Sequence, residues 1–188
     1  RHIGPDIKSL SGLAIGSLTL TPEFNRETLE YTVTTNNASN KVTAEATDPG
    51  DVITIKNGTT TVENGEAAEW NVGDNTLTIT VADRDDPTAT TEYVVTVHRN
   101  SSACAITSFA IGTATGVINT TDHTIAVEVP SGTTVTALEP TIAVSAGASV
   151  SPASGVATDF TSPVEYTVTA EDGTTTQVWT VTVTVASI

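Results

Sequence analysis

The sequence lacks methionine, has a single cysteine, and contains few aromatic residues, which make up 4% of its 188 positions. Because Cys104 has no second cysteine to pair with, the fold must rest on hydrophobic burial and hydrogen-bonded strands rather than on disulfides. No apolar run is long enough to cross a bilayer as a helix, so direct membrane insertion is not expected. The most frequent β-branched residues are threonine and valine, which favour strands over helices.

Basic residues are also scarce. Seven Lys and Arg stand against 22 Asp and Glu, which gives a formal net charge of −15. All seven basic residues precede Asn100, so the second half of the chain has no Lys or Arg. Both halves would repel a polyanion, and nucleic acid is therefore excluded as an expected partner.

Alternation of apolar and polar residues is the main positive signal in this sequence. It places apolar side chains on one face of each expected strand and mostly threonine on the other, which is typical of half-buried antiparallel strands. No helical spacing of apolar residues persists for three turns. The apolar rows are Tyr31 and Val33; Leu77, Ile79 and Val81; Tyr93, Val95 and Val97; Ile125, Val127 and Val129; Ile142 and Val144; Tyr166 and Val168; and Trp179, Val181, Val183 and Val185.

An internal repeat divides the chain. The stretch EYTVTAEDGTTTQVWTVTVTV at residues 165–185 has a looser copy, LTITVADRDDPTATTEYVVTVHR, at residues 77–99. The openings match as well, since LSGLAIGS at residues 10–17 corresponds to AITSFAIGT at residues 105–113. Each repeat therefore begins with one comparable strand and ends with one comparable hairpin.

The repeat predicts two domains of similar size. We expect an all-β chain of two tandem Ig-like or cadherin-like antiparallel β-sandwiches, comprising residues 1–99 and residues 100–188, with a short linker at residues 99–103. The dipeptide Asp172-Gly173 between two alternating runs is a strong signal for a tight hairpin turn. The equivalent turn in the first half, DRDDPTAT, is longer.

Each half of the chain carries motifs with a specific spacing. Residues 8–99 contain LTLTPEFNRETLEYTV, in which Leu-x-Pro-x-Phe precedes Tyr-x-Val, followed by GDNTLTITV and a terminal EYVVTVHR. This half resembles the bacterial cadherin-like β-sandwich domain. Residues 105–185, with ITSFAIG, IAVEVPSGTTVTALEPTIAVSAGASVSP and the closing hairpin, are similar to an Ig-like domain of uncharacterised function found in surface lipoproteins of Bacteroides-type bacteria.

These resemblances imply two sandwich folds and an extracellular setting on the bacterial cell surface. Neither family brings a catalytic residue. Similar modules also occur on phage virion proteins, so a virion is the alternative location.

Three aspartates, Asp83, Asp85 and Asp86, crowd one expected turn between strands. They are the candidate ligands for Ca²⁺, the one cofactor that the sequence suggests, because calcium takes roughly six to eight oxygen ligands. Arg84 lies within the cluster, and residues 99–103 lack the Asn-Asp pair that supplies interdomain ligands in animal cadherins. A solvated acidic turn is therefore the competing interpretation.

Two tryptophans, Trp70 and Trp179, are candidate sugar-stacking platforms, since exposed aromatic faces commonly bind carbohydrate. Each is in phase with a valine, Trp70 with Val72 and Trp179 with Val181, which favours packing in the core instead. With so few aromatic residues in the chain, little remains to line a binding groove.

No catalytic arrangement is apparent, and we expect no enzyme activity. His2, His98 and His123 are scattered without a second His or Cys at metal-ligand spacing, and no Gly-x-Ser-x-Gly motif occurs. A lysine–asparagine isopeptide cross-link is excluded from the second half, which has no lysine, and remains open in the first half.

The sequence thus favours a non-catalytic, surface-exposed structural or adhesion segment of a larger bacterial protein. The alternatives are a decoration or fibre module of a phage virion and a carbohydrate-binding accessory module of a secreted enzyme. The expected partner is a protein or glycan on a cell surface. Residues 180–185, which lack charge and proline, are a candidate edge strand for self-association.

Overall fold

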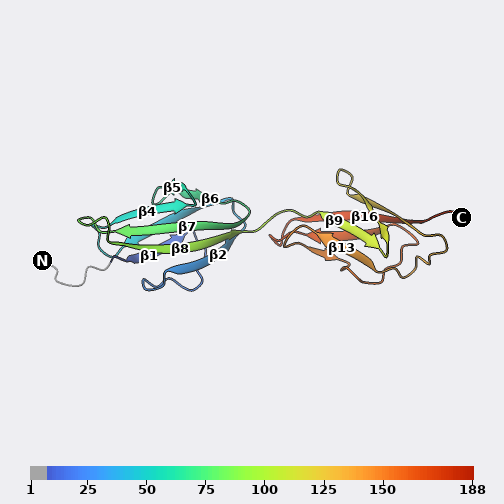
Figure 1. Cartoon of the computed structure of the whole chain (residues 1–188), viewed down its shortest axis with the longest axis horizontal. Coiled ribbons are helices and arrows are strands. Elements are labelled where there is room, and N and C mark those ends of the chain that lie inside the picture. Colours follow the sequence, from blue (N-terminus) through green and yellow to red (C-terminus); the bar gives the residue numbers. More distant parts are fainter. Residues whose placement is uncertain (1–7) are drawn as a thin grey trace. The chain divides into compact units, whose positions relative to one another are not determined.

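The computed structural model describes residues 8–188, and these residues form β-strands and connecting loops without any helix. The chain divides into two compact units, Arg1–Asn100 and Ser101–Ile188. Each unit has two layers of strands (Figure 1), one three-stranded and one five-stranded sheet. The predicted fold class, two tandem β-sandwiches, is confirmed.

The first unit places β1, β3 and β6 in its smaller sheet and β2, β8, β7, β4 and β5, in that order, in its larger sheet. Strands β5 and β6 are edge strands of three residues each, and they follow one another in the chain. The strands are β1 (Leu10–Ile15), β2 (Glu30–Thr35), β3 (Ser39–Ala46), β4 (Val52–Asn57), β5 (Thr60–Val62), β6 (Ala67–Glu69), β7 (Gly73–Ala82) and β8 (Thr90–Arg99).

The second unit repeats this plan with β10, β9 and β13 in the smaller sheet and β11, β12, β16, β15 and β14 in the larger sheet. Its strands are β9 (Ile106–Ile111), β10 (Ala114–Thr115), β11 (Val117–Asn119), β12 (Thr124–Val129), β13 (Pro140–Val144), β14 (Ser149–Ser151), β15 (Val164–Thr169) and β16 (Thr176–Val185).

Each unit has its own hydrophobic core between its two sheets. The predicted apolar rows face these cores because alternate side chains of a strand point to the same side. Nearly all of their members are buried, Val144 and Val183 are half-buried, and Val185 is the exception at 44% exposed. The alternation therefore predicted the inward face of almost every long strand.

Both closing hairpins form as expected, by antiparallel pairing of β7 with β8 and of β15 with β16. The sheets are mainly antiparallel, as expected, and each unit contains one parallel pair of strands in its larger sheet. The last strand of each unit also pairs in parallel with an early strand, β8 with β2 and β16 with β12. Parallel neighbours need a long connection, and here the rest of the sandwich supplies it.

Residues 180–185, the candidate edge strand, are paired with β12 along their whole length. Strand β16 lies inside the five-stranded sheet, between β12 and β15, and the edges of that sheet are β11 and β14. The parallel ladder with β12 covers all six residues, ending with the pair Val129 and Val185. This pairing engages the backbone N–H and C=O groups on one side of residues 180–185, a segment whose composition alone suggested an open edge.

The expected linker at residues 99–103 is hydrogen-bonded at its start. Within the first unit, the Asn100 N–H donates to the Thr35 carbonyl at 2.9 Å. Within the second unit, the Ser101 N–H donates to the Glu171 carboxylate at 2.8 Å. Asn100 and Ser101 are consecutive in the chain, and each is hydrogen-bonded to residues of its own unit.

Candidate functional site

Asp83, the first candidate calcium ligand, follows β7 and turns its side chain toward the interior of the first unit. Its Oδ1 accepts hydrogen bonds from the N–H groups of Asp85 at 2.6 Å and Asp86 at 2.9 Å. Its Oδ2 forms an ion pair with Lys8. Both oxygens of Asp83 are therefore engaged by groups of the protein itself.

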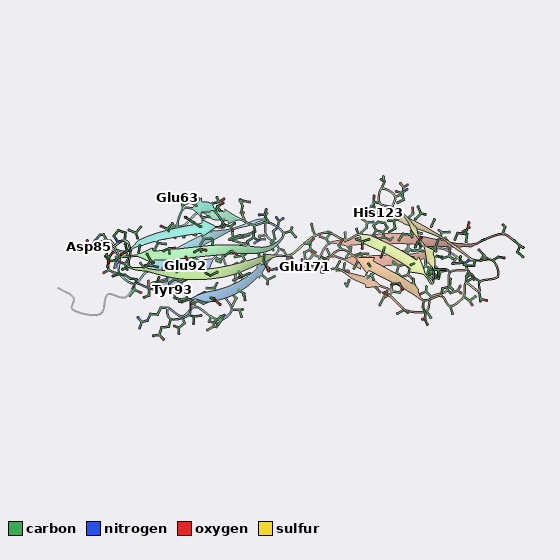
Figure 2. The ribbon with its side chains drawn as sticks, viewed as in Figure 1. Glu63, Asp85, Glu92, Tyr93, His123 and Glu171 are labelled. Atoms are coloured by element: carbon green, nitrogen blue, oxygen red, sulfur yellow. The ribbon has the colours of Figure 1, made fainter. Side chains whose placement is uncertain are left out.

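The other two aspartates of this turn point elsewhere. The Asp85 side chain is 88% exposed at the tip of the unit (Figure 2), and its Oδ1 lies 3.8 Å from the Arg84 Nε. The Asp86 Oδ1 accepts hydrogen bonds from the Thr88 hydroxyl at 2.6 Å and the Thr88 N–H at 3.1 Å. These bonds lower the pKa of the Asp86 carboxyl.

The three carboxylates do not converge on a common point. Among residues 8–188, no group of three or more His, Cys, Asp or Glu side chains is placed to hold a metal ion. The turn instead has the arrangement of a loop in which aspartates accept hydrogen bonds from nearby N–H groups.

Both candidate stacking residues are buried, Trp70 at 3% and Trp179 at 1% exposed. The Trp70 indole N–H donates to the Asn40 Oδ1 at 3.0 Å, and the Trp179 indole N–H donates to the Cys104 carbonyl at 3.3 Å. Neither ring presents an open face on which a sugar could stack.

The expected row of Trp70 and Val72 does not exist, because Val72 is 56% exposed while Trp70 is buried. Both residues lie between β6 and β7, outside any strand, so the strict alternation of a strand does not apply to them.

The histidines also stay apart in the described chain. The His98 Nδ1 lies 2.5 Å from the Asp74 Oδ1 in the first unit. In the second unit the His123 ring packs edge-on against Trp179, with ring centroids 5.1 Å apart. His2 lies outside the described residues.

No helix among residues 8–188 is long and apolar enough to cross a membrane.

A groove of about 790 Å³ lies on the side of the first unit, between β5 and β6. Figure 2 shows Glu63 on this side of the unit. Acidic and amide side chains line the groove together with threonines and Trp70. The polar members include Asn57, Glu63, Glu66, Glu69, Asn71 and Asp74.

The groove exists because both of its edge strands are short. Strands β5 and β6 have three residues each, so neither closes the gap between the two sheets. The Asn57 side-chain N–H bridges that gap by donating to the Glu69 carbonyl at 2.6 Å. Sequence reasoning missed this site, although the polar run at residues 57–76, with its Asn, Glu and Thr, was a readable signal.

Comparison with known protein families divides the chain as its fold does. Residues 15–100 match a family model described as a cadherin-like beta sandwich domain. Residues 106–183 match a model described as SGBP, N-terminal. The two halves match two different families. The resemblances read from the sequence are confirmed at the level of these domain families.

Three solved structures illustrate how far structural likeness extends. A candidate glycoside hydrolase from Bacteroides thetaiotaomicron is 32% identical over 47% of this chain and 26% of its own, with a TM-score of 0.43. The extracellular domains 3–5 of Drosophila OTK are 12% identical over 92% of this chain and 63% of theirs, with a TM-score of 0.35. A chimeric titin Z1Z2 tandem is 12% identical over 90% of this chain and 100% of its own, with a TM-score of 0.26.

These TM-scores are too low to carry an argument about function. The chain spans about a quarter of the Bacteroides protein and less than two thirds of the OTK structure. No curated protein matches the chain.

Proposed function

We propose that this chain is a non-catalytic, surface-exposed segment of a larger bacterial extracellular protein, in which the two sandwiches act as structural or adhesion modules. The match of residues 106–183 to the SGBP N-terminal family, whose name denotes surface glycan-binding proteins, carries this proposal. The cadherin-like match of residues 15–100 agrees with an extracellular module. Neither family model names a virion protein.

The side chains of the described residues support an architectural role. The large aromatic residues of both units are buried or half-buried, and both indole N–H groups are hydrogen-bonded. The outer faces of the long strands carry mostly threonine, as in Thr76, Thr78 and Thr80 of β7. Such faces are wettable and have a high strand propensity, which suits a module that works in water.

Removing the segment from its parent protein tests this role. We expect the purified parent without the segment to keep any activity of its remaining domains, because a structural module contributes no reacting group. Activity of intact cells toward a large substrate should fall, and an unrelated pair of sandwiches of similar length should restore it. A loss of activity in the purified, shortened parent would contradict the proposal.

A second candidate function is direct contact with a glycan in the groove between β5 and β6. The groove offers carboxylate and amide groups within about 790 Å³, and sugar hydroxyls can both donate to and accept from such groups. The groove lies in the first unit, whereas the SGBP N-terminal match lies in the second.

A glycan array followed by calorimetric titration tests this second function. Any glycan bound in the groove should lose about tenfold in affinity in Glu66→Gln, which replaces a charged acceptor with a neutral amide, or in Asn71→Ala, which removes an amide. The matched control is Glu30→Gln, on an exposed position of β2 outside the groove. Equal affinity in the groove variants and the control would show that the glycan binds elsewhere.

A further inference from the structure

The ion pair of Lys8 and Asp83 is buried between the two sheets of the first unit. The side chains are only 10% and 13% exposed, and the Lys8 Nζ itself is buried. Lys8 precedes β1 in the three-stranded sheet, whereas Asp83 follows β7 in the five-stranded sheet. The pair therefore joins the two layers at one end of the sandwich.

A second carboxylate, that of Asp51, faces the same region. The β4–β7 ladder ends with the pair Val52 and Ala82, so Asp51 and Asp83 are the residues that directly adjoin this end of the two strands. Residues directly opposite in such a ladder have Cβ atoms roughly 5 Å apart. The Asp51 Oδ2 is buried, which agrees with a side chain that points into the sandwich.

The two oxygens of Asp83 are in different surroundings. Oδ1 accepts two backbone N–H groups, at 2.6 Å and 2.9 Å, while Oδ2 faces the Lys8 ammonium. Backbone N–H groups fixed on one oxygen stabilise the negative charge that develops there when a nucleophile adds to the carboxyl carbon. The site therefore has a nucleophile, an electrophile and a preformed oxyanion site.

We propose that Lys8 and Asp83 form an intramolecular isopeptide bond and that Asp51 promotes the reaction. Transfer of one proton from the Lys8 ammonium to the Asp83 Oδ2 within the pair gives the neutral amine and the neutral acid that react. The bond from Nζ to the Asp83 carboxyl carbon forms, and the bond from that carbon to Oδ2 breaks. Oδ2 leaves as water with two of the three ammonium protons, so no oxidant, reductant or other reactant is required.

Asp51 relays a proton in this scheme. Its carboxylate accepts a proton from Nζ as the amine attacks and returns that proton to Oδ2 as the oxygen leaves. The bond differs from the lysine–asparagine cross-link left open by the sequence, because an aspartate is the acceptor. It is independent of the function proposed above, since it would join the two sheets of the first unit whatever the chain contacts.

The intact mass of the purified, denatured chain tests the proposal directly. We expect the chain to be lighter than its sequence mass by one water molecule, and a protease digest to contain a branched peptide that joins Lys8 to Asp83. A folded chain with its full sequence mass would overturn the proposal.

Variants of Lys8, Asp83 and Asp51 distinguish this isopeptide bond from a loss of water elsewhere in the chain. Lys8→Arg keeps the positive charge and should restore the full mass, whereas Asp83→Asn should lose ammonia instead of water because the leaving group has changed. Asp51→Asn should slow bond formation and leave a larger unreacted fraction at equal times after synthesis. A loss of water that persists in Lys8→Arg would place the dehydration elsewhere and overturn the assignment.

Exposed residues of the same types provide matched controls. Lys41→Arg and Asp159→Asn change an exposed lysine of the first unit and an exposed aspartate of the second unit, and both variants should keep the loss of one water. Circular dichroism of each variant before denaturation establishes that the sandwich has folded.

Discussion

Both units consist of one three-stranded and one five-stranded sheet, but the hairpin that contains the last strand is paired over its full length only in the first unit. In the first unit, β7 and β8 pair along all ten residues of each strand. In the second unit, β15 has six residues against the ten of β16, so residues 182–185 pair only with β12. Pro163 immediately precedes β15 and has no N–H to donate to a ladder, which accounts for the late start of that strand.

The cores of the units also differ in how their aromatic residues are held. In the first unit, the hydroxyls of Tyr31 and Tyr93 donate to the carbonyls of Asn25 and Arg26, at 2.6 Å and 2.7 Å. In the second unit, Phe109, Phe160 and Tyr166 pack on one another, with centroids 5.5 Å to 6.5 Å apart. The same sandwich is thus held by tyrosine hydrogen bonds to a loop in one unit and by an aromatic cluster in the other.

The largest expected effect comes from removing the largest fully buried side chain of the second unit. Trp179→Ala should destabilise that unit by about 3–5 kcal/mol, because it creates a cavity where the indole is now 1% exposed. Differential scanning calorimetry should show one transition shifted and the other unchanged. The neighbouring Val178→Ala, on the outer face, serves as the control, and an equal shift of both transitions would contradict two separate cores.

The tyrosines provide a sharper contrast between the units. Tyr93→Phe should cost the first unit about 1–3 kcal/mol, because the Tyr93 hydroxyl accepts from the Leu10 N–H at 3.1 Å and donates to the Arg26 carbonyl. The Tyr166 hydroxyl is near Thr158 but makes no hydrogen bond of ordinary geometry within the described chain. Tyr166→Phe should therefore reduce the free energy of unfolding of its unit by less than Tyr93→Phe does. Urea unfolding of both variants measures this, and a larger loss of stability in Tyr166→Phe would contradict this interpretation.

The next comparison concerns one glycine with a positive φ in a turn of each unit. Gly147 has a φ of +74°, and a Cβ there would come within 2.7 Å of the Glu171 side chain. Gly147→Ala should cost the second unit about 1–3 kcal/mol, from both backbone strain and this contact. Gly58 in the first unit also has a positive φ, +56°, but has open space around it, so Gly58→Ala should cost less in the same thermal unfolding experiment.

The smallest expected effect is the acid sensitivity of the closing turn. The hydroxyl and N–H of Thr175 and the N–H of Thr174 hold the pKa of the Asp172 carboxyl at about 2, below its ordinary value of 3.8. Because this pKa is depressed in the folded state, the stabilisation is present above pH 3.8 and is lost as the pH falls toward 2. Between pH 3.8 and pH 2, the Asp172→Ala variant should lose less stability than the wild type does in acid unfolding. An identical dependence of stability on pH in the two proteins would contradict this role.

Much of the fold could be predicted from local patterns, and the particular failures have one physical cause. The alternation in β7, β8 and β12 fixes which side chains face inward, so the core residues and the closing hairpins followed from the sequence. Alternation does not specify which strand lies beside another. The parallel pairing that places β16 inside its sheet was therefore missed.

The candidate sites were less predictable for a related reason. Lys8 and Asp83 are far apart in the sequence and meet because the strands that they adjoin, β1 and β7, belong to the two facing sheets. The three aspartates of the turn are close in sequence, yet their carboxylates point in different directions. Proximity along the chain suggested a metal cluster, whereas the fold brings one of those aspartates to a lysine.

Surface exposure of the parent protein on intact bacteria tests the central claim most directly. Antibodies raised against residues 1–188 should label intact, unpermeabilised cells, because an extracellular module is accessible from outside, and permeabilisation should add little signal. Labelling that appears only after permeabilisation would contradict a surface-exposed segment.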